Sequence, residues 1–457
     1  MKIAIKKLAE RIPYCVGKYL VGVPYQFRLG AHYTDFSDIL KQGHTEEQAA
    51  RYSLQNFNLI FNYAKSKFPF YKELYQEYGV ENLSIQNFDD IKKLPIVNKD
   101  MLRGPNANFS GTLKLNTGGT TGTPLAFYVD KNAFAREWAH MHFIWALRGY
   151  NYRSVKLTLR GRNLGKHPFV YNCVHNEFIV NTYLPITQYA HRLLGLILKV
   201  KIKFIHGYPS AIYNFLRQLE NYLSDKEFEA LKSCISCCLL GSEYPPPYVT
   251  KYLSDTWEMD YISWYGHSEM CILAFDSQKN GQYAPMQTYG YAEVDSDHLL
   301  GTSFHNYDMP LIRYDTGDRV QGQNGKTGLL ESFRITEGRI GDFIEDLQGN
   351  AIPLTALIFG RHHKIFDYAN SVQIYQARPG QAIFFVVLQS EMSSEQALTL
   401  FDTGHVNIQF GIKFISKPIL SPSGKMLLKI LHPPHEFMPQ QRNPGKNHLR
   451  MGLTLNL

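Results

Sequence analysis

Hydrophobic and polar positions change their spacing twice along the chain, which divides the sequence into three parts. Over Glu46–Phe61, and again over Phe70–Tyr75, apolar and aromatic side chains recur every three or four positions, and this spacing predicts helices. From about residue 115, short apolar runs alternate with helical stretches. Beyond Asp276 the runs are short and separated by turn residues, which predicts β-structure.

The middle part has the pattern of a layered α/β fold. Strands that alternate with helices form largely parallel sheets with helices on their faces, so we expect such a sheet here. In these folds active sites lie in the loops beyond the strand ends. The strands are predicted at Phe127–Val129, Val155–Leu159, Phe204–His206, Ile235–Leu240 and Asp260–Trp264, and the helices at Phe134–Arg148, Tyr189–Val200, Ser210–Leu223 and Tyr248–Thr256.

The third part is predicted to be β-rich as far as a second boundary near Arg339. A small α+β unit is expected beyond that boundary, ending in a basic tail. The elements before it are extended segments at Tyr291–Val294 and Leu311–Tyr314 and a turn at Gly322–Gly325; those after it are a hairpin over Phe343–Asn350, strands at Gln373–Gln376 and Ala382–Leu388, and a helix at Ser394–Phe401.

Together these patterns predict an α/β protein with two domains. A chain of 457 residues is too long for one ordinary domain. The large N-terminal domain, residues 1–338, would hold a helical lead-in over about residues 1–110, α/β layers and a small β-rich subdomain. Residues 339–457 would form a small, mobile α+β C-terminal domain.

Positive charge is concentrated at the two ends of the chain. The net charge is +8, yet residues 1–30 hold six basic residues against one acidic, and residues 413–457 hold seven against one. These ends are either solvated tails or a means of attracting an anionic acceptor or a membrane surface, which would give peripheral membrane contact. No nucleic-acid motif or aromatic–basic alternation accompanies them, which argues against nucleic acid as a partner.

The six cysteines are scattered, a usage typical of the reducing cytoplasm, so we expect a cytoplasmic protein. Cys234 and Cys237 have one half of a zinc-knuckle spacing, but no second pair follows and both lie in an apolar run. This favours packing over metal binding. A transmembrane helix needs an uninterrupted run of about 18 apolar residues, and the sequence has none.

One stretch combines glycines and hydroxyl side chains in the way that phosphate loops do. It reads Asn116-Thr117-Gly118-Gly119-Thr120-Thr121-Gly122-Thr123-Pro124. The glycines allow close approach of the backbone, and the threonine hydroxyls and free N–H groups supply donors to phosphate oxygens. It is not a Walker loop, because the Lys-Ser/Thr pair is missing. Taken alone, the stretch would also suit a hairpin turn.

Four further motifs follow in order along the chain. They are Tyr265-Gly266-His267-Ser268-Glu269, Tyr314-Asp315-Thr316-Gly317-Asp318, Gly338-Arg339-Ile340-Gly341-Asp342 and Ser423-Gly424-Lys425. With the Gly/Thr-rich loop, this ordered set resembles the superfamily of acyl-CoA synthetases, amino-acid adenylation domains and luciferases. The resemblance spans about residues 60–430. It is nearest to phenylacetate-CoA ligase relatives and to their capsular polysaccharide branch, called CapK-type; Leu94–Lys99 and His206–Ala211 also match that branch.

The resemblance implies a role for each motif in binding ATP and Mg²⁺. Thr117–Thr123 would hold the β- and γ-phosphates, with Ser268 adding a hydroxyl, and Glu269 would be a Mg²⁺ ligand. Tyr265, beside Gly266, would stack on adenine, and the backbone of Gly241-Ser242-Glu243 would approach the same ring. Asp318 would bind the ribose hydroxyls. Alternative interpretations are a core aromatic for Tyr265, a helix-start carboxylate for Glu269 and a turn aspartate for Asp318.

Two cations are implied to act at the reacting centre. Arg339 would reach the ribose or the α-phosphate near a hinge between the domains. Lys425 would bridge the substrate carboxylate and the α-phosphate, since a compact ammonium on a long stem suits a domain that delivers charge and then leaves. In isolation Lys425 would be taken for a surface lysine.

Some positions depart from the pattern of the family. Gly118 stands where Ser is common, Leu125 where Lys is common, and Gly341 where the hinge aspartate is expected. Glycine absorbs large changes in φ and ψ, so a hinge is retained. No CoA pocket is identifiable in the sequence.

The function that the resemblance implies has two steps. A carboxylic or amino acid would react with ATP to give an acyl-AMP and pyrophosphate, and the acyl group would then pass to CoA or to an amine or amino-sugar acceptor. We expect the acyl pocket between the Tyr208–Ser210 loop and Ser242–Tyr248. The alternative is a degenerate, non-catalytic nucleotide-binding partner in a polysaccharide assembly; a glycosyltransferase is disfavoured, since Asp295-Ser296-Asp297 lies in a turn context.

Overall fold

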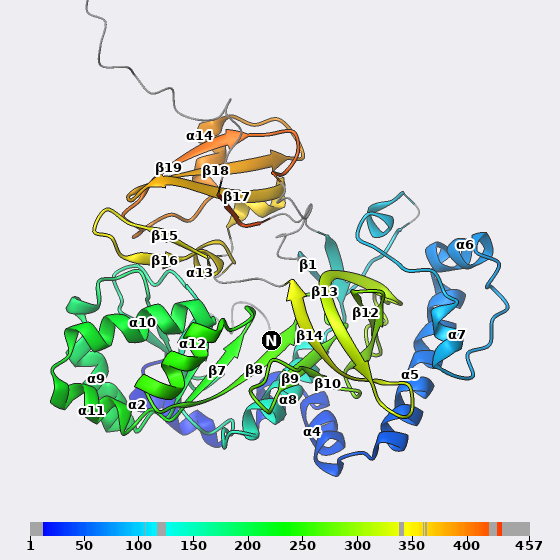
Figure 1. Cartoon of the computed structure of the whole chain (residues 1–457), viewed down its shortest axis with the longest axis horizontal. Helices are drawn as coiled ribbons and strands as arrows, with labels where there is room; N and C mark the ends of the chain where they lie inside the picture. The colour runs from blue at the N-terminus through cyan, green and yellow to red at the C-terminus, as the bar shows by residue number, and fades with distance from the viewer. Residues whose placement is uncertain are drawn as a thin grey trace, which may run out of the picture.

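The computed structural model describes residues 12–105, 107–116, 125–337, 342–359, 361, 363–419 and 427–431. These residues form one eight-stranded sheet, two four-stranded sheets and two two-stranded ribbons. In Figure 1 the helical lead-in (blue) runs along the base, and the C-terminal strands (orange) stand above the rest of the molecule. The prediction of a mixed α/β protein is confirmed at this level.

The large sheet runs in the order β10-β9-β8-β7-β6-β3-β5-β4. The strands β5, β3, β6, β7 and β8 are parallel to one another, whereas β4 at one edge and β9 and β10 at the other pair antiparallel. The largely parallel sheet is therefore confirmed. The bounds are β3 Lys156–Leu159, β4 Phe169–Asn172, β5 Glu177–Val180, β6 Phe204–Gly207, β7 Cys237–Gly241, β8 Asp260–Gly266, β9 Leu273–Asp276 and β10 Ala284–Pro285.

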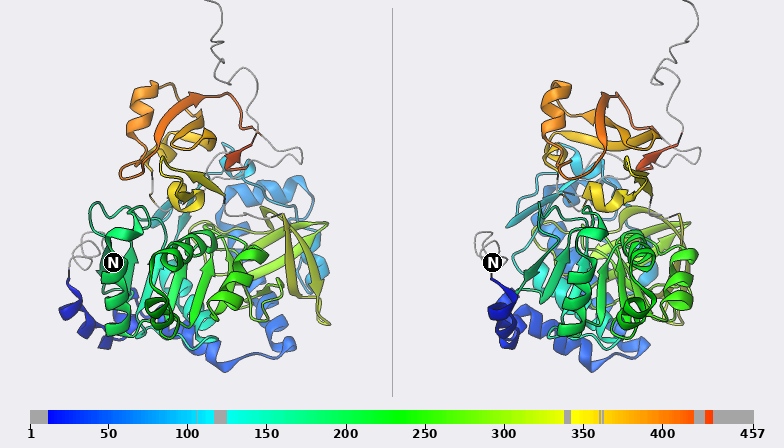
Figure 2. Two further views of the ribbon diagram at one scale, coloured as in Figure 1. Left: turned by 60° about the vertical axis from the view of Figure 1, so that its left-hand side comes forward. Right: turned by 90° about the vertical axis from the view of Figure 1, so that its left-hand side faces the viewer.

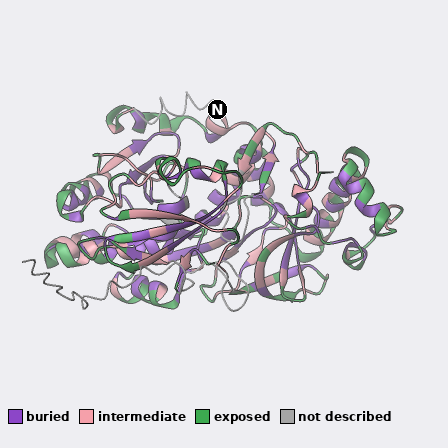
Figure 3. Ribbon diagram, turned by 90° about the horizontal axis from the view of Figure 1, so that it is seen from above, coloured by how far each residue is buried: buried purple, intermediate pink, exposed green. Residues whose placement is uncertain are grey.

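Successive side chains of the parallel strands enter two different cores. In β7, Cys238 and Leu240 pack with the helices of one face, and Cys237 and Leu239 pack with those of the other. Strands buried on both faces are continuously apolar, which explains the run that the sequence shows here. Burial raises the pKa of the Cys237 thiol to about 12, and this thiol is part of the packing. Figure 3 shows these central strands as the buried interior, with exposed residues on the outer helices.

Helices cover both faces of the sheet. On one face lie α9 (Ala190–Val200), α10 (Pro209–Tyr222), α11 (Asp225–Lys232) and α12 (Pro247–Lys251), the last continued by a π-helical turn η4 (Tyr252–Thr256). The other face is covered by α8 (Ala133–Ala146), with Leu40 of α4 packed alongside it. Figure 2 shows the two helical layers with the sheet between them.

The lead-in is helical, as predicted. Its longest helix, α5, begins with a capping box between Thr45 and Gln48 and ends just before Pro69, which starts α6. The elements are α2 Tyr14–Gly17, η1 Lys18–Gly22, α3 Tyr25–Leu29, α4 His32–Gln42, α5 Glu46–Lys67, α6 Pro69–Glu77, α7 Phe88–Lys92 and η2 Met101–Arg103, followed by the ribbon β1 Leu113–Asn116 and β2 Ala126–Val129.

The β-rich part is a four-stranded antiparallel sheet that shares a core with α5 and α6. Its strands are β11 Gly290–Asp295, β12 His298–Ser303, β13 Tyr314–Asn324 and β14 Leu330–Glu337. Two expectations fail here. Leu311–Arg313 is not a strand, since Arg313 has φ +46. Gly322 lies inside β13, where it pairs with Phe333 of β14, rather than in a turn. An added Cβ there would lie 2.7 Å from Val294 Cγ2.

The C-terminal unit is described over parts of residues 342–431 and has its own core. Tyr183 of the N-terminal part packs against this core. The predicted hairpin is present as β15 paired with β16. The elements are β15 Phe343–Glu345, β16 Ala351–Pro353, α13 Leu354–Phe359, η5 Lys364–Asp367, β17 Ala369–Arg378, β18 Gln381–Leu388, α14 Ser394–Thr399, β19 Gln409–Phe414 and β20 Lys429–Ile430, with the sheet order β19-β18-β17-β20.

None of the helices in the described parts of the chain has both the length and the apolar character that crossing a bilayer requires.

Arg313 ties the lead-in to the β-rich sheet. Its guanidinium is buried, donates to Glu293 Oε1 at 2.8 Å, and donates to the carbonyl oxygens of Lys92 and Leu94. Burial raises the pKa of Glu293, and the guanidinium opposes this shift. The left-handed backbone of Arg313 turns its side chain into this position.

We expect Arg313→Ala to lower the free energy of unfolding by about 3–5 kcal/mol, because it leaves the carboxylate of Glu293 buried and unpaired. Urea unfolding followed by tryptophan fluorescence measures this loss. The matched control is Arg319→Ala on β13, which removes an exposed ion pair with Asp297 of the turn between β11 and β12 and should cost about 1 kcal/mol or less. Equal losses for the two variants would contradict the role given to Arg313.

Candidate active site

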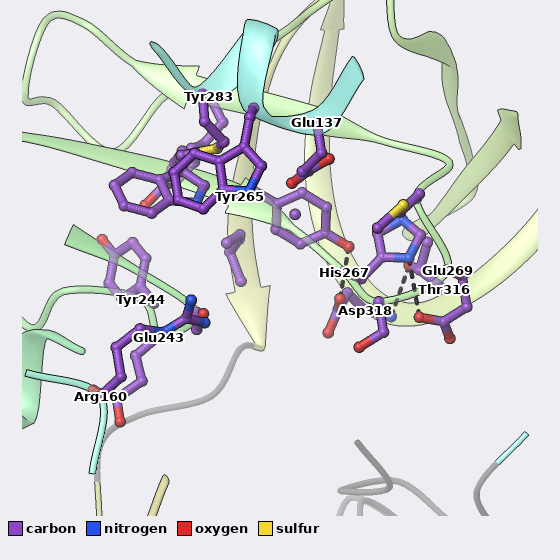
Figure 4. Close-up of a pocket in the computed structure, with 18 of the residues that line it drawn as sticks. Glu137, Arg160, Glu243, Tyr244, Tyr265, His267, Glu269, Tyr283, Thr316 and Asp318 are labelled. Atoms are coloured by element: carbon purple, nitrogen blue, oxygen red, sulfur yellow. Dashed lines mark hydrogen bonds and ion pairs between the residues drawn. The ribbon is translucent and has the colours of Figure 1, made fainter. Parts of the chain in front are cut away.

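A cavity of about 390 Å³ opens at the carboxyl ends of β3, β6, β7 and β8. This is where parallel α/β sheets place their ligands. Strands β13 and β14 and helix α8 contribute the remaining walls (Figure 4). The residues that line it are Lys99, Phe134, Glu137, Trp138, Met141, Trp145, Arg160, His206, Ser242, Glu243, Tyr244, Trp264, Tyr265, Gly266, His267, Ser268, Glu269, Met270, Tyr283, Thr316, Asp318 and Ile335.

Tyr265 and Asp318 form one polar contact in the wall. The Tyr265 hydroxyl donates to Asp318 Oδ2 at 2.7 Å, and Figure 4 shows the bond. The Tyr265 ring packs edge-on against Phe333, with centroids 5.3 Å apart. Asp318 can face Tyr265 because β13 bulges here: its pairing with β12 is irregular between Asp315 and Arg319, and Gly317 has φ +79. The irregular strand presents one carboxylate and one ring to the same space.

The carboxylate of Glu269 is buried and held by three groups. Tyr314 donates to Oε1 at 2.8 Å, His267 Nδ1 lies 3.3 Å from Oε2, and the Lys99 ammonium lies 3.6 Å from Oε1. Burial alone would raise the pKa of this carboxyl, but the His267 contact, Lys99 and Tyr314 lower it to about 2. Glu269 is therefore an ionised carboxylate in the wall of the cavity at neutral pH.

The turn after β7 is fixed by close packing and by a helix cap. At Gly241 an added Cβ would lie 2.2 Å from Trp264 Cζ2, and the next residue, Ser242, has φ +68. The Glu243 carboxylate accepts from the Ser210 N–H at 3.0 Å and from its hydroxyl at 2.9 Å. Since Ser210 is in the first turn of α10, the carboxylate occupies the positive end of that helix. The backbone of the turn is thereby held at the cavity rim.

The other half of the cavity is aromatic. Phe134, Trp138, Met141 and Trp145 lie on one face of α8, at helical spacing. Across from them, His206 stacks on Trp264 with ring centroids 5.6 Å apart. Burial and the nearby Arg160 lower the pKa of His206 to about 3, so its imidazole is neutral.

The structure brings together most of the predicted site residues that it describes. Seven of them line the cavity: Ser242, Glu243, Tyr265, Gly266, Ser268, Glu269 and Asp318. Gly241 lies directly behind it against Trp264. The predictions for Thr117, Gly118, Gly119, Thr120, Thr121, Gly122, Thr123, Arg339 and Lys425 fall outside the described residues. Tyr208, expected beside the acyl pocket, is buried and is not among the residues that line the cavity.

Several lining residues were not assigned from the sequence. Arg160 and His206 lie at strand ends, a position that could have indicated them. Lys99 and His267 belong to sequence motifs whose pattern indicates no role for these two side chains. Glu137 and the tryptophans of α8 had no signal, because the face that a helix turns to a cavity depends on the packing of the whole sheet.

A comparison with known proteins identifies the relationship. No family model matches the chain. Protein CapK of Staphylococcus aureus is 22% identical over 398 residues, which cover 81% of this chain and 86% of the relative. The chain is similar to CapK over most of the length of both proteins. The predicted resemblance to CapK-type proteins is thereby confirmed.

Solved structures similar to this chain include 2-hydroxyisobutyryl-CoA ligase in two states. One is the postadenylation state with R3-HIB-AMP, which is 15% identical, covers 82% of this chain and 88% of its own, and has a TM-score of 0.47. The other is the thioesterification state with 2-HIB-AMP and CoA, with 14% identity, coverage of 84% and 90%, and a TM-score of 0.48. The apo structure of MbtA from Mycobacterium smegmatis is 13% identical, with coverage of 69% and 63% and a TM-score of 0.33.

The donor set at Glu269 fits a hard cation that is shared with phosphates. Mg²⁺ takes one or two protein carboxylates and fills its shell with phosphate and water oxygens. Glu269 offers one ionised carboxylate at the cavity wall, and no cluster of three metal-ligating side chains occurs within the described ranges. The residues present therefore suit a metal that arrives with its nucleotide.

We expect Glu269→Gln to make stability less dependent on pH. The pKa of Glu269 in the folded protein lies below its ordinary value of 4.5. Its ionisation therefore stabilises the fold above that pH, and the contribution is lost as the pH falls toward about 2. A shift of this size corresponds to about 3 kcal/mol at neutral pH. Urea unfolding at a series of pH values between about 5 and 3 should show the gap between the wild-type protein and the variant shrinking.

The control for this measurement is Glu331→Gln, which alters an exposed glutamate on β14. Its unfolding curve should follow that of the wild-type protein at each pH. A gap for Glu269→Gln that stays constant over the range would show that the carboxylate is not held ionised by its neighbours.

Proposed function

We propose that this protein uses ATP and Mg²⁺ to convert a carboxylic acid into an acyl-AMP with release of pyrophosphate. The observation that carries the proposal is the gathering of Tyr265, Glu269, Asp318 and the Ser242–Tyr244 turn around one cavity at the strand ends. These come from three distant motifs of the sequence. A nucleotide bound there would meet an aromatic ring, a backbone turn and two carboxylates in one space.

The polar half of the cavity suits a nucleoside. A carboxylate such as Asp318 accepts hydrogen bonds from both ribose hydroxyls, the usual way in which proteins recognise ribose. The Tyr265 hydroxyl holds Asp318 in place, and the rings of Tyr265 and Tyr244 stand beside the turn that would approach adenine. The Ser268 hydroxyl is exposed at the same rim and is available to a phosphate oxygen.

Glu269 is the residue that would hold Mg²⁺, and the metal would supply charge neutralisation between the phosphates and the attacking carboxylate. Lys99 and His267 fix the position of this carboxylate before the nucleotide arrives. Alignment and charge neutralisation are most of the task, because the two reactants are both anionic.

We assign the remaining positive charge to Arg339 and Lys425, in keeping with the matched motifs. The C-terminal unit that carries Lys425 rests on the N-terminal part through polar contacts and the packing of Tyr183. Asn163 donates to Asp402 at 2.9 Å, Asn214 donates to the Ala351 carbonyl at 2.7 Å, and the Arg361 guanidinium lies 3.8 Å from the centroid of the Tyr183 ring. Interfaces of this kind permit the movement that would bring Lys425 in and remove it again.

The second step would transfer the acyl group to CoA or to an amine, with an amino sugar of a surface polysaccharide as one acceptor. The basic ends of the chain suit either acceptor when it carries phosphates, and they also suit contact with an anionic membrane surface.

ATP–pyrophosphate exchange over a panel of carboxylic and amino acids tests the first step. We expect exchange that depends on both Mg²⁺ and one class of acid, because only an acid that fits the aromatic half can be aligned with the α-phosphate. Exchange with no acid, together with measurable ATP binding, would instead support a degenerate nucleotide-binding protein.

Lys425→Ala should lower the exchange rate by about 100-fold or more, because charge at the reacting oxygens is lost. Transfer from a preformed acyl-AMP to the acceptor should continue, since that step does not use the adenylating position of the lysine. Quenched-flow measurement separates the two rates. Lys417→Ala removes a neighbouring positive charge as a control; retention of both half-reactions by Lys425→Ala would refute the assignment.

A further inference from the structure

Four carboxylates line the cavity among the described residues. In the proposed function Asp318 binds the nucleotide and Glu269 the metal, and Glu243 caps a helix. Glu137 is the fourth, and it has no role there. It projects from α8, one turn from Phe134 and Met141, on the helix face that lines the aromatic half. In Figure 4 it points into the space beside Tyr265 and His267. It stands where the nucleotide-facing residues meet the aromatic wall.

The carboxyl of Glu137 is anchored on one side. The Tyr289 hydroxyl donates to its Oε2. Within the described residues no hydrogen bond reaches Oε1. The charges that act on the group, those of His267, Arg160 and Arg136, do so through space rather than by hydrogen bonds. Arg136 is itself paired with Asp130. One oxygen of a fixed carboxyl thus remains for a ligand.

Burial raises the pKa of Glu137 above its ordinary value, and Tyr289 and the nearby cations act in the opposite direction. Glu137 is half-buried, and a carboxylate that has lost part of its hydration is stabilised by a positive partner. The cavity therefore favours a ligand that brings positive charge to this point.

Aromatic rings surround the same space. Trp138 and Trp145 of α8, Trp264 of β8 and Tyr265 line the cavity. The faces of indole and phenol rings attract cations electrostatically, most strongly when water is excluded. A carboxylate beside such rings is the combination that recognises an ammonium group, whereas rings alone would suit a plain aromatic or aliphatic acid.

We propose that Glu137 determines substrate specificity by binding an ammonium group on the acid that is activated, so that the substrate is an amino acid rather than a plain carboxylic acid. This inference rests on the proposed function and adds the substrate class to it. The ammonium would donate to Oε1 of Glu137 while the carboxylate of the same molecule faces the nucleotide. A charge-assisted hydrogen bond of this kind is among the stronger polar contacts.

The proposal also explains why a plain acid would be a poor substrate. An acid without a donor group would displace water from the Glu137 carboxylate without replacing the hydrogen bonds that the water made. Sites built to bond a polar substrate group reject the analogue without that group by factors of about 10⁴. A glutamate in the otherwise apolar half of the cavity would weaken the binding of a fatty or aromatic acid and strengthen the binding of an amino acid.

The experiment uses matched acids in ATP–pyrophosphate exchange with the full-length protein. The first set is alanine, lactate and propanoate; the second is β-alanine, 3-hydroxypropanoate and propanoate; the third is 4-aminobutanoate, 4-hydroxybutanoate and butanoate. We expect the wild-type protein to prefer the amino member of one set by about 100-fold or more in kcat/KM. Glu137→Gln keeps the size and removes the charge, and should lower that preference to about tenfold or less through KM for the acid.

A second carboxylate–tyrosine pair provides the control. Glu220 of α10 accepts from the Tyr252 hydroxyl outside the cavity, so Glu220→Gln makes the same chemical change at a remote position. This control should keep the preference of the wild-type protein. Equilibrium binding of ATP, measured by calorimetry, should be unchanged in Glu137→Gln, which shows that the variant is folded.

The outcomes separate the inference from the proposed function. Preference for a hydroxy or plain acid, or an amino-acid preference that Glu137→Gln retains, would overturn the inference and leave acid activation standing. Exchange with no acid would overturn both. If Glu137→Gln no longer binds ATP, Glu137→Asp takes its place in the experiment. The shorter side chain should raise KM for the amino acid alone. An unchanged KM in that variant would also overturn the inference.

Discussion

The buried carboxylate of Glu269 is the constraint on which the geometry of the site depends. A buried charge is tolerated only when its partners are in place, and removing a partner is costly. The partners here come from three parts of the chain: Lys99 from the end of the lead-in, Tyr314 from the first residue of β13, and His267 from the loop after β8. The carboxylate can remain ionised only when these parts are assembled, so folding and the formation of the site are one event.

Strand β13 contributes to two polar contacts of the site. Tyr314 serves Glu269, and four residues later Asp318 meets Tyr265. Two departures from regular strand geometry make this possible: the left-handed Arg313 just before the strand, and the bulge around Gly317 within it. Arg313 at the same time fixes the lead-in against Glu293. Irregular backbone is thus placed where one strand must direct side chains to both the interior and the cavity.

Much of the fold could be predicted because its sequence patterns are local. The apolar run of β7 and the helical spacing of α5 and α10 each reflect burial of a fixed face, which depends little on distant residues. The motif residues Tyr265, Glu269 and Asp318 could be predicted from their order along the chain. Residues 311–313 were wrongly taken as extended, because the hydrogen bonds of Arg313 to the lead-in, which no local pattern reveals, decide their conformation.

Glu137 and His206 could not be assigned for a related reason. Their role depends on which face of α8 and which end of β6 border the cavity, and this is set by the order of strands in the sheet. The cysteines illustrate the opposite case: the apolar context of Cys237 predicted packing, and β7 buries it. The role of a residue can be predicted from the sequence when it depends on one strand or one helix alone. A role that depends on how separate elements meet can be assigned only once the topology is known.

The cavity also explains why the reaction would require a second, movable part of the chain. All of its described lining residues come from the N-terminal part, and they provide four carboxylates but few cations: Lys99, which is paired with Glu269, and Arg160 beside Tyr208. Such a wall can bind a nucleoside and a metal, but it repels an anionic acid and a triphosphate that arrive together. Positive charge from the C-terminal side would remove this repulsion only at the moment of reaction. The C-terminal unit has its own core and meets the rest through hydrogen bonds and the packing of Tyr183, and interfaces between domains of this kind are compatible with such transient delivery.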